Sequence, residues 1–260
     1  MICLYPIRLK SGQRVPCGRC AACLQRKVRD TQFRLKEECK SETSLLSGFL
    51  TLTYNDKHLP LDGVSRRDVQ LFHKRLRKAG YQFKYKLISE YGPTTYRPHY
   101  HGLYFFSRFG KTRHKIKDIS DLEDELCKIW SLGNITFDEV LEERITYISN
   151  YHVTKGLFPH GKNPNFSVSS HNLGISALTP QYLDWIRSNS TTTKQGFRQS
   201  IPRYLRDKGI LTESEKERIA QKSDPNYFYE VKKETVENWS RVMWWQRKVK
   251  QKIINKKNKI

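Results

Sequence analysis

Apolar positions recur along residues 20–155 with two different periods, and these predict helices in some segments and strands in others. Apolar spacings of three and four residues, with polar residues between them, predict helices. These helices cover residues 24–40, 65–78, 118–130 and 142–155. Runs rich in β-branched and aromatic residues, closed by Asn, Gly or Pro, predict strands. These strands cover residues 49–54, 83–91, 97–106 and 135–140.

The order of the predicted elements is β, α, β, β, α, β, α. It indicates the α+β class, with a small antiparallel sheet and helices on one face, as in ferredoxin-like and RRM-like folds. We expect residues 41–158 to form this core. A cysteine-rich segment and its helix precede the core at residues 1–40. An extension follows at residues 159–260, where Pro, Gly, Asn and Ser are frequent at first and a basic helical tail ends the chain.

The charge balance points to a polyanionic partner. The chain has 260 residues, and its 48 Lys and Arg against 26 Asp and Glu give a formal net charge of +22. Such an excess is typical of nucleic-acid-binding proteins, while 12% aromatic residues favour a folded body over a disordered basic chain. The first residues have no signal-peptide pattern, and no run approaches the roughly 18 apolar residues of a membrane span. We expect an intracellular protein that acts on nucleic acid, with no membrane partner.

The charges are unevenly distributed. Residues 118–143 contain nine acidic residues against one lysine, so we place that segment away from phosphates. Residues 241–260 contain eight Lys and Arg and no acid, beside three tryptophans. A role of this tail in gripping DNA is a hypothesis, since basic termini are often only solvated. Candidate DNA contacts on the folded part are Arg66, Arg67, Lys74 and Arg97.

Three of the six cysteines are closely spaced, in the run Cys17-x-x-Cys20-x-x-Cys23. In a chain without a secretion signal, such thiols indicate metal ligands before disulfides. A tetrahedral zinc ion needs a fourth ligand. Cys3 or Cys39 would serve, and we favour Cys3 because it would tie down the N-terminus. An iron–sulfur cluster, or thiols without metal, are the alternatives. Any metal here would be structural.

Two histidines stand two residues apart in Arg97-Pro-His99-Tyr-His101. On a strand they share one face, with Cα atoms about 6–7 Å apart. If the preceding strand pairs antiparallel across the turn, Glu90 comes to lie beside them. Two imidazoles and one carboxylate with open positions suit catalytic Mn²⁺, or Mg²⁺ completed by water and phosphate oxygens. The alternative is a surface pair of histidines without a function.

Tyr147, Tyr151 and Lys155 are spaced by four residues, so they share one face of the helix over 142–155. Such a tyrosine stripe usually packs or stacks. Beside a metal site, a phenolate can attack a phosphodiester and form a covalent phosphotyrosine, while the metal polarises the phosphate. Lys155 would stabilise the phenolate or the phosphate. Because Tyr151 is nearer to Lys155, we expect it to attack first, a hypothesis that single Tyr→Phe variants test.

These residues resemble a known family, the rolling-circle replication initiators of microviruses of the gokushovirus type. These initiators are HUH endonucleases, named for two histidines around a hydrophobic residue, here His99-Tyr-His101 in the context Arg-Pro-His-Tyr-His-Gly. The strand at 49–54 resembles the family's first motif. Glu90 matches the third metal ligand, and Tyr147, Tyr151 and Lys155 match the paired nucleophiles and the lysine after them. The run Pro-Cys-Gly-x-Cys and the segments at 172–175 and 201–208 also resemble the phage proteins, although 172–175 lacks the expected proline.

The resemblance implies a site-specific nuclease and ligase that nicks single-stranded DNA at a phage origin. The cut leaves a 3′-OH and a 5′-phosphotyrosine, and the second tyrosine serves termination and circularisation. No Gly-Lys-Ser/Thr nucleotide loop is present, so we expect a host helicase and polymerase as partners, in the bacterial cytoplasm. Two alternatives stay open: a nonenzymatic binder of single-stranded nucleic acid that stacks bases on its sheet, and a plasmid relaxase or transposase of the same class.

Overall fold

A computed structural model describes most of the first 208 residues of the chain and three residues after them. The described residues are 3–10, 12, 14–109, 118–154, 158–188, 191–194, 197–200, 202–208, 212 and 214–215. They fall into two compact units: one contains the described residues up to 37 and those from 174 onward, and the other contains residues 38–173. Lys155 and the basic tail lie outside the described residues. No described helix is long and apolar enough to cross a membrane.

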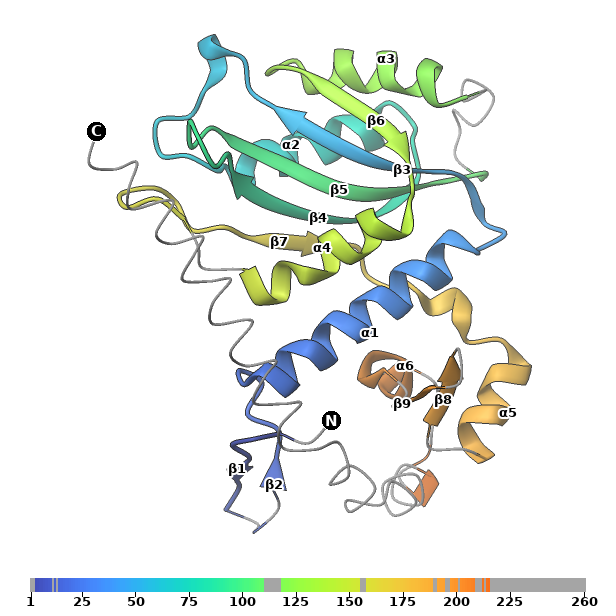
Figure 1. The fold of residues 1–260 in the computed structure, drawn as a ribbon. Coiled ribbons are helices and arrows are strands. Elements are labelled where there is room, and N and C mark those ends of the chain that lie inside the picture. The colour runs from blue at the N-terminus through green and yellow to red at the C-terminus, as the bar shows by residue number, and fades with distance from the viewer. Residues whose placement is uncertain are drawn as a thin grey trace. The chain divides into compact units, whose positions relative to one another are not determined.

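The unit of residues 38–173 is built on a five-stranded antiparallel sheet in the order β6-β3-β5-β4-β7 (Figure 1). Its strands are β3 (Ser44–Thr53), β4 (Phe83–Tyr91), β5 (Pro98–Ser107), β6 (Ile135–Glu139) and β7 (Ser167–Ser169). Its helices are η1 (Asp56–His58), α2 (Arg66–Lys78), α3 (Ile119–Trp130) and α4 (Glu142–Thr154). The predicted α+β class and antiparallel sheet are confirmed, and all eight predicted helices and strands are present.

Helices α2 and α3 cover one face of the sheet. Ser65 caps α2 by accepting a hydrogen bond from the backbone amide of Asp68, as expected of a serine at this position. Phe72 of α2 and Trp130 of α3 pack on each other and on the β5 residues that point to this face, among them Tyr100. The core of this unit therefore lies between the sheet and these two helices.

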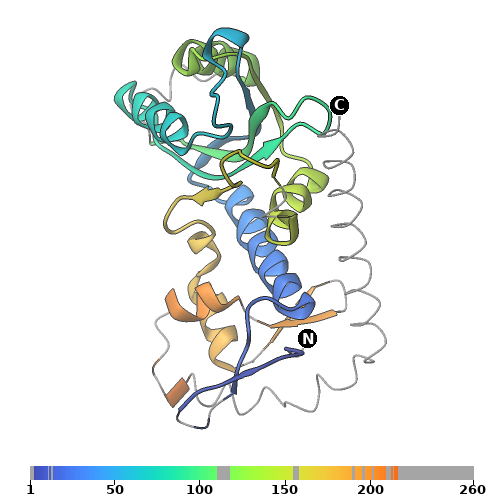
Figure 2. The ribbon, with the colours of Figure 1, turned by 90° about the vertical axis from the view of Figure 1, so that its left-hand side faces the viewer.

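Helix α4 contacts the other face of the sheet, so the expectation of helices on one face holds only for α2 and α3 (Figures 1 and 2). Successive side chains of a strand point to opposite faces. Tyr100 of β5 faces the core with α2, whereas His101 next to it contacts Tyr147 of α4. Periodicity predicted α4 itself, and Ile145 and Ile148 are buried as expected, but it carried no information about which face the helix covers.

Strand β7 was not predicted, because a three-residue strand of Ser-Val-Ser is too short and too polar to give a periodic signal. Its pairing with β4 is supported by side chains. Ser89 and Phe166 exchange hydrogen bonds through the serine hydroxyl, and Ser170 Oγ accepts from the backbone amide of Tyr85. These bonds extend the sheet beyond the expected core boundary at residue 158.

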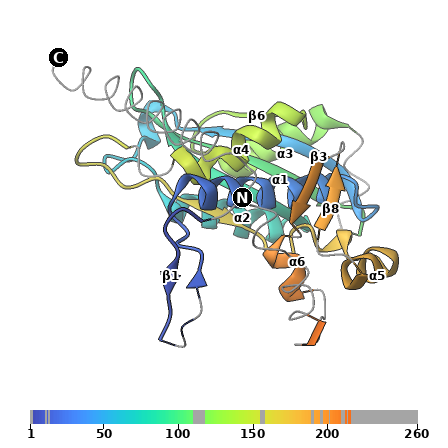
Figure 3. The same cartoon turned by 60° about the horizontal axis from the view of Figure 1, so that its bottom comes forward.

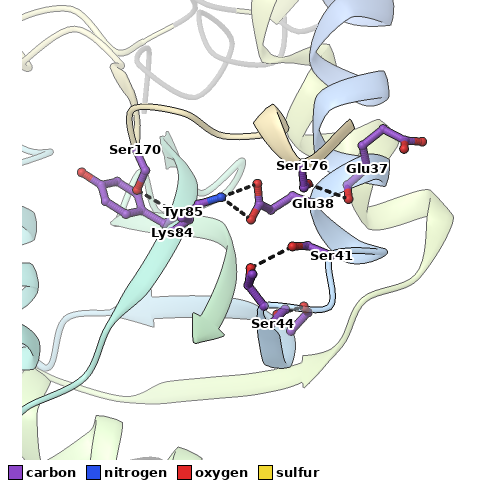
Figure 4. A network of polar contacts seen from close by, with 10 residues as sticks. Glu37, Glu38, Ser41, Ser44, Lys84, Tyr85, Ser170 and Ser176 are labelled. Atoms are coloured by element: carbon purple, nitrogen blue, oxygen red, sulfur yellow. Dashed lines mark hydrogen bonds and ion pairs between the residues drawn. The ribbon is translucent and has the colours of Figure 1, made fainter. Parts of the chain in front are cut away.

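A buried ion pair joins the end of α1 (Ala21–Cys39) to β4 (Figure 4). Lys84 Nζ donates to both carboxylate oxygens of Glu38, at 2.7 and 3.0 Å, and the Glu38 side chain is almost fully buried. Such a pair is costly to break, because it would leave a charge buried without its partner. It therefore fixes the chain where the sheet unit begins.

The other unit contains the first part of α1 and the described residues from 174 onward. Its further elements are β1 (Ile7–Arg8), β2 (Arg14–Val15), η3 (Ile175–Ala177), α5 (Pro180–Ser188), β8 (Thr191–Lys194), β9 (Phe197–Ser200) and α6 (Arg203–Lys208). A small cluster around Leu205 and Ala177 packs against Phe33 of α1 and Tyr182 of α5. The guanidinium of Arg34 lies 3.8 Å from the ring centroid of Tyr204. The expected three-part division of the chain stays a prediction.

Candidate metal and tyrosine site

Strands β4 and β5 bring Glu90, His99 and His101 together on the face that α4 covers. The antiparallel register places Glu90 directly opposite His99, and His101 follows two residues along the same face. One ligand atom from each of the three side chains lies within 4.8 Å of the others. Two imidazoles and one carboxylate are a donor set that fits Mn²⁺, and also Mg²⁺ with further oxygen ligands, so these residues can hold a divalent metal.

Hydrogen bonds to Nδ1 orient both histidine rings. The Nδ1 atom of His99 lies 3.1 Å from the carbonyl oxygen of Arg97, which only accepts, so Nδ1 carries the proton and Nε2 is left to bind a metal. The Nδ1 atom of His101 lies 3.0 Å from Thr51 Oγ1 of β3. Phe49 stacks on the ring of His101, and the Arg144 guanidinium lies 4.9 Å from the ring centroid of Phe49.

The electrostatic environment keeps His101 neutral. Burial, followed by the neighbouring His99, lowers its pKa to about 4. A neutral imidazole is the form that binds metal. At neutral pH the ligand set therefore carries no bound proton on His101 that a metal would have to displace.

The two tyrosines of α4 differ in their surroundings. The hydroxyl of Tyr147 donates a hydrogen bond to Glu90 Oε2, and its ring lies edge-on to His101 with centroids 5.6 Å apart. Tyr147 is 43% exposed, whereas Tyr151, one turn later, is only 5% exposed. Burial, followed by the Glu90 carboxylate, raises the pKa of Tyr147 well above its usual value. Burial also raises the pKa of Tyr151 to about 12, and the positive charge of Arg66 opposes that rise.

Arg66 is the described cation whose charge acts on Tyr151, because Lys155 lies outside the described residues. Its guanidinium lies 4.6 Å from the ring centroid of Phe166. Arg66 and Arg67 both line a cavity of about 450 Å³ between residues 60–67 and 163–166. A positively charged cavity with an aromatic wall is suited to a phosphate and its base.

The other two candidate DNA contacts lie elsewhere on this unit. Arg97 forms an ion pair with Asp56 at 2.6 Å and donates to the carbonyl oxygen of Tyr54, so it holds η1 and the end of β3. Lys74 is exposed on α2, whose helix covers the face of the sheet opposite to the histidines. Arg66 and Arg67 are therefore the candidates that the fold places nearest to the tyrosines.

Sequence reasoning missed the contribution of Thr51 and Arg144. Thr51 is separated from His101 by 50 residues in the chain, and only the pairing of β3 with β5 makes them opposite partners. Alternation along the strand at 49–54 indicated that Thr51 shares a face with Phe49, but not which strand would lie beside it.

The cysteine motif forms a second group. The sulfur atoms of Cys3, Cys17, Cys20 and Cys23 all lie within 4.8 Å of one another, so these four residues can bind a zinc ion. Backbone amides of residues 19 and 20 donate to Cys17 Sγ and lower the pKa of this thiol to about 6. Cys39 is not a member of the group.

Comparisons with known proteins agree with this arrangement. Residues 47–156 match the family of the replication-associated protein ORF2. The chain is 26% identical to "Replication-associated protein VP4" of Bdellovibrio phage phiMH2K, over 74% of the chain and 66% of the relative. It is 26% identical to "Replication-associated protein ORF4" of Chlamydia phage 1, over 74% of the chain and 53% of the relative. It is 28% identical to "Replication-associated protein ORF2" of Spiroplasma virus 4, over 54% of the chain and 48% of the relative.

The matched segment contains β3, β4, β5, β6 and nearly all of the site on α4. The chain spans about half to two thirds of the length of these curated relatives. No solved structure matches the chain significantly.

Proposed function

We propose, from the premise that residues 47–156 belong to the family of the replication-associated protein ORF2, that the chain initiates rolling-circle replication of a phage genome. It would nick single-stranded DNA at an origin by metal-dependent tyrosine transesterification and rejoin the ends at termination. One observation carries the proposal: the hydroxyl of Tyr147 is hydrogen-bonded to Glu90, one of the three candidate metal ligands. Nucleic-acid binding alone requires neither this contact nor the paired histidines.

Glu90, His99 and His101 would hold Mn²⁺ or Mg²⁺. When bound, the metal supplies positive charge that polarises the scissile phosphate and offsets charge in the transition state. The Glu90 carboxylate accepts the hydrogen bond of Tyr147, so it holds the proton that must leave before the phenolate oxygen attacks. The new bond joins the tyrosine oxygen to phosphorus, and the bond to the 3′ oxygen breaks. The leaving oxygen takes up a proton and becomes a 3′-OH, while the 5′ end stays on the enzyme as a phosphotyrosine.

Because the ester keeps the energy of the broken bond, attack by a 3′-OH on the phosphotyrosine reseals the strand. Two tyrosines at adjacent turns of α4 allow one to hold an end while the other attacks. The different exposure of the two side chains supports Tyr147 as the first nucleophile, in place of Tyr151 as expected from the sequence. Tyr151 would act later, with the positive charge of Arg66 favouring its phenolate. Lys155 remains a proposed partner of Tyr151.

The wider assignment is part of the same proposal. The relatives are phage proteins, so the substrate would be a phage origin, and a host helicase and polymerase in the bacterial cytoplasm would extend the 3′-OH. A relaxase or transposase of the same class would use the same site chemistry. The origin sequence that is cleaved separates these assignments.

The test uses single-stranded DNA labelled at either end, carrying candidate origins, with and without Mn²⁺. A denaturing gel should show a metal-dependent protein–DNA adduct on the 5′ end of the cut. Tyr147→Phe should abolish the first adduct, whereas Tyr151→Phe should retain it, and Tyr5→Phe serves as an exposed control. Salt-sensitive binding without an adduct on any origin would contradict the proposal and favour the nonenzymatic binder. Loss of the first adduct in Tyr151→Phe alone would reverse the order of the tyrosines.

A further inference from the structure

The proposed nuclease chemistry does not use the four clustered cysteines. Cys3 precedes the two-residue strands β1 and β2, Cys17 and Cys20 follow them, and Cys23 lies in the first turn of α1 (Figure 3). Cys3 and Cys23 are buried, and the other two are half-buried. Four thiols in one place, drawn from a hairpin and a helix start, require an explanation that packing alone does not supply.

The distances between the sulfur atoms match a tetrahedron around one ion. The sulfur atoms of Cys17 and Cys23 are 4.0 Å apart, and those of Cys20 and Cys3 are 3.9 Å apart. A zinc–sulfur bond of about 2.3 Å gives an edge of about 3.8 Å for a regular tetrahedron. A disulfide would bring two sulfurs to about 2 Å, and all four cysteines are free. An iron–sulfur cluster would attach the thiolates to different irons and separate the sulfurs further.

Backbone amides are arranged to stabilise thiolates. The amide of Cys17 donates to Cys3 Sγ at 3.2 Å, and the amides of Arg19 and Cys20 donate to Cys17 Sγ at 3.5 and 3.4 Å. Lys27 Nζ donates to the carbonyl oxygen of Gly18 at 2.9 Å, which places its positive charge beside this loop. Four thiolates around a divalent ion leave two negative charges, and these donors offset them.

The segment that the cysteines hold has little other support. Strands β1 and β2 have two residues each, and Tyr5, Ile7 and Leu9 are exposed. A hairpin this short is not stable in isolation. Short segments without a core are commonly stabilised by a metal, whose binding free energy becomes folding free energy.

We propose that Cys3, Cys17, Cys20 and Cys23 bind one Zn²⁺ ion in a closed, structural site that holds the β1–β2 hairpin against the start of α1. All four positions of the tetrahedron are filled by protein, so the ion has no open position for catalysis. This inference is independent of the proposed nuclease.

The first test measures the metal content of the full chain by mass spectrometry, in a His99→Ala/His101→Ala background that removes the other candidate metal site. We expect about one zinc per chain. Cys20→Ser should reduce it at least about tenfold, whereas Cys39→Ser and Cys127→Ser should retain it. Absence of zinc, iron with acid-labile sulfide, or equal loss in Cys39→Ser would each overturn the proposal.

A second measurement needs no variant, so it remains decisive if Cys20→Ser does not fold. The native chain is treated with a thiol reagent in the presence of a zinc indicator. Only Cys39 and Cys127 should react while zinc is held, and zinc should be released as the other four thiols react. Reaction of all six thiols in the native chain without zinc release would contradict the site. A missing DNA adduct with zinc still bound would count against the nuclease alone.

Discussion

Thr51 shows how one side chain outside the ligand set can control a metal site. Its Oγ1 atom lies 3.0 Å from His101 Nδ1, so it fixes the orientation of the ring that presents Nε2 to a metal. Removing such a partner typically costs 10–100-fold in metal affinity. The side chain itself is not a ligand, and its effect would pass through His101.

We expect Thr51→Val to weaken Mn²⁺ binding about tenfold, because the valine keeps the shape of threonine but loses the hydrogen bond. Calorimetric titration with Mn²⁺ measures this. Thr53→Val is the matched control, since the Thr53 hydroxyl on the same strand donates to the carbonyl oxygen of Asn134 and not to a ligand. Equal losses in both variants would show that the hydrogen bond to His101 is not the cause.

His73 is a buried histidine that links the stability of the fold to pH. It lies on α2, its Nε2 atom is 2.7 Å from the Tyr104 hydroxyl, and its ring centroid is 3.9 Å from that of Tyr85. Burial, followed by the charge of Arg77, lowers its pKa to about 3. The folded chain therefore binds fewer protons here than the unfolded chain, whose histidine titrates near 6.5. Stability is lost as the pH falls from about 6.5 toward 3.

We expect His73→Gln to flatten the dependence of the unfolding free energy on pH between 6 and 4, by up to about 1.4 kcal/mol per pH unit. The variant itself will be less stable at neutral pH, so the slope and not the absolute value is the readout. Urea unfolding at several pH values measures it. His58→Gln, at an exposed histidine, should leave the slope unchanged. An unchanged slope in His73→Gln would mean that other groups cause the acid sensitivity.

At the scale of elements, close approach between strands constrains β3. Gly48 lies beside β6, and a Cβ atom at this position would overlap the ring of Phe137. Phe137 is 1% exposed and packs against Phe106, so it has little room to move. This position requires glycine for space and not for backbone conformation.

We expect Gly48→Ala to destabilise the fold by about 1–3 kcal/mol, as overpacking in cores does. Thermal unfolding measures this, and a second substitution, Phe137→Leu, should restore part of the loss by making room. Gly92→Ala is the control, because a Cβ atom there meets its neighbours no closer than 3.6 Å. A loss in Gly92→Ala as large as that in Gly48→Ala would contradict the packing argument.

Element boundaries were predicted well where the signal is local. Strand β4 has the predicted bounds, and α2 begins directly after its Ser65 cap. Helix α1 begins three residues before the prediction, because Ala21 and Ala22 carry no strong periodic signal. The hairpin of β1 and β2, strand β7 and the elements after residue 174 were missed, since they are short or lack periodicity.

At the scale of the molecule, the positive charge is expected to direct DNA toward the tyrosines. Arg66 and Arg67 line the cavity of about 450 Å³, and the charge of Arg66 acts on Tyr151. The acidic surface lies elsewhere: α3 and β6 fall within the segment of residues 118–143, which has nine acids and one lysine. The two regions should therefore contribute differently to binding.

We expect Arg66→Ala to weaken binding of a single-stranded oligonucleotide and to reduce the slope of log affinity against log salt concentration by about one. Fluorescence anisotropy over a range of salt concentrations measures both. Lys128→Ala, in the acidic segment, is the control and should change neither quantity. An unchanged slope in Arg66→Ala would place the DNA path away from this cavity.

The sequence by itself determined what depends on short spacings. Residues two apart on a strand share a face, which placed His99 with His101, and residues four apart on a helix share a face, which placed Tyr147 with Tyr151. Composition and charge indicated a folded, nucleic-acid-binding protein for the same reason: they are sums over the chain and need no geometry.

Only the tertiary structure decided which of these groups meet. The β4–β5 register set Glu90 opposite His99, and the β3–β5 pairing brought Thr51 to His101. Packing placed α4 on the histidine face, so that Tyr147 reaches Glu90, and the path of the first residues brought Cys3 to the other three thiols. The contacts of Cys3 with Cys17, of Thr51 with His101 and of Glu90 with Tyr147 join residues 14, 50 and 57 positions apart. Such partners are selected by the burial and hydrogen bonding of the whole fold, which no local pattern encodes.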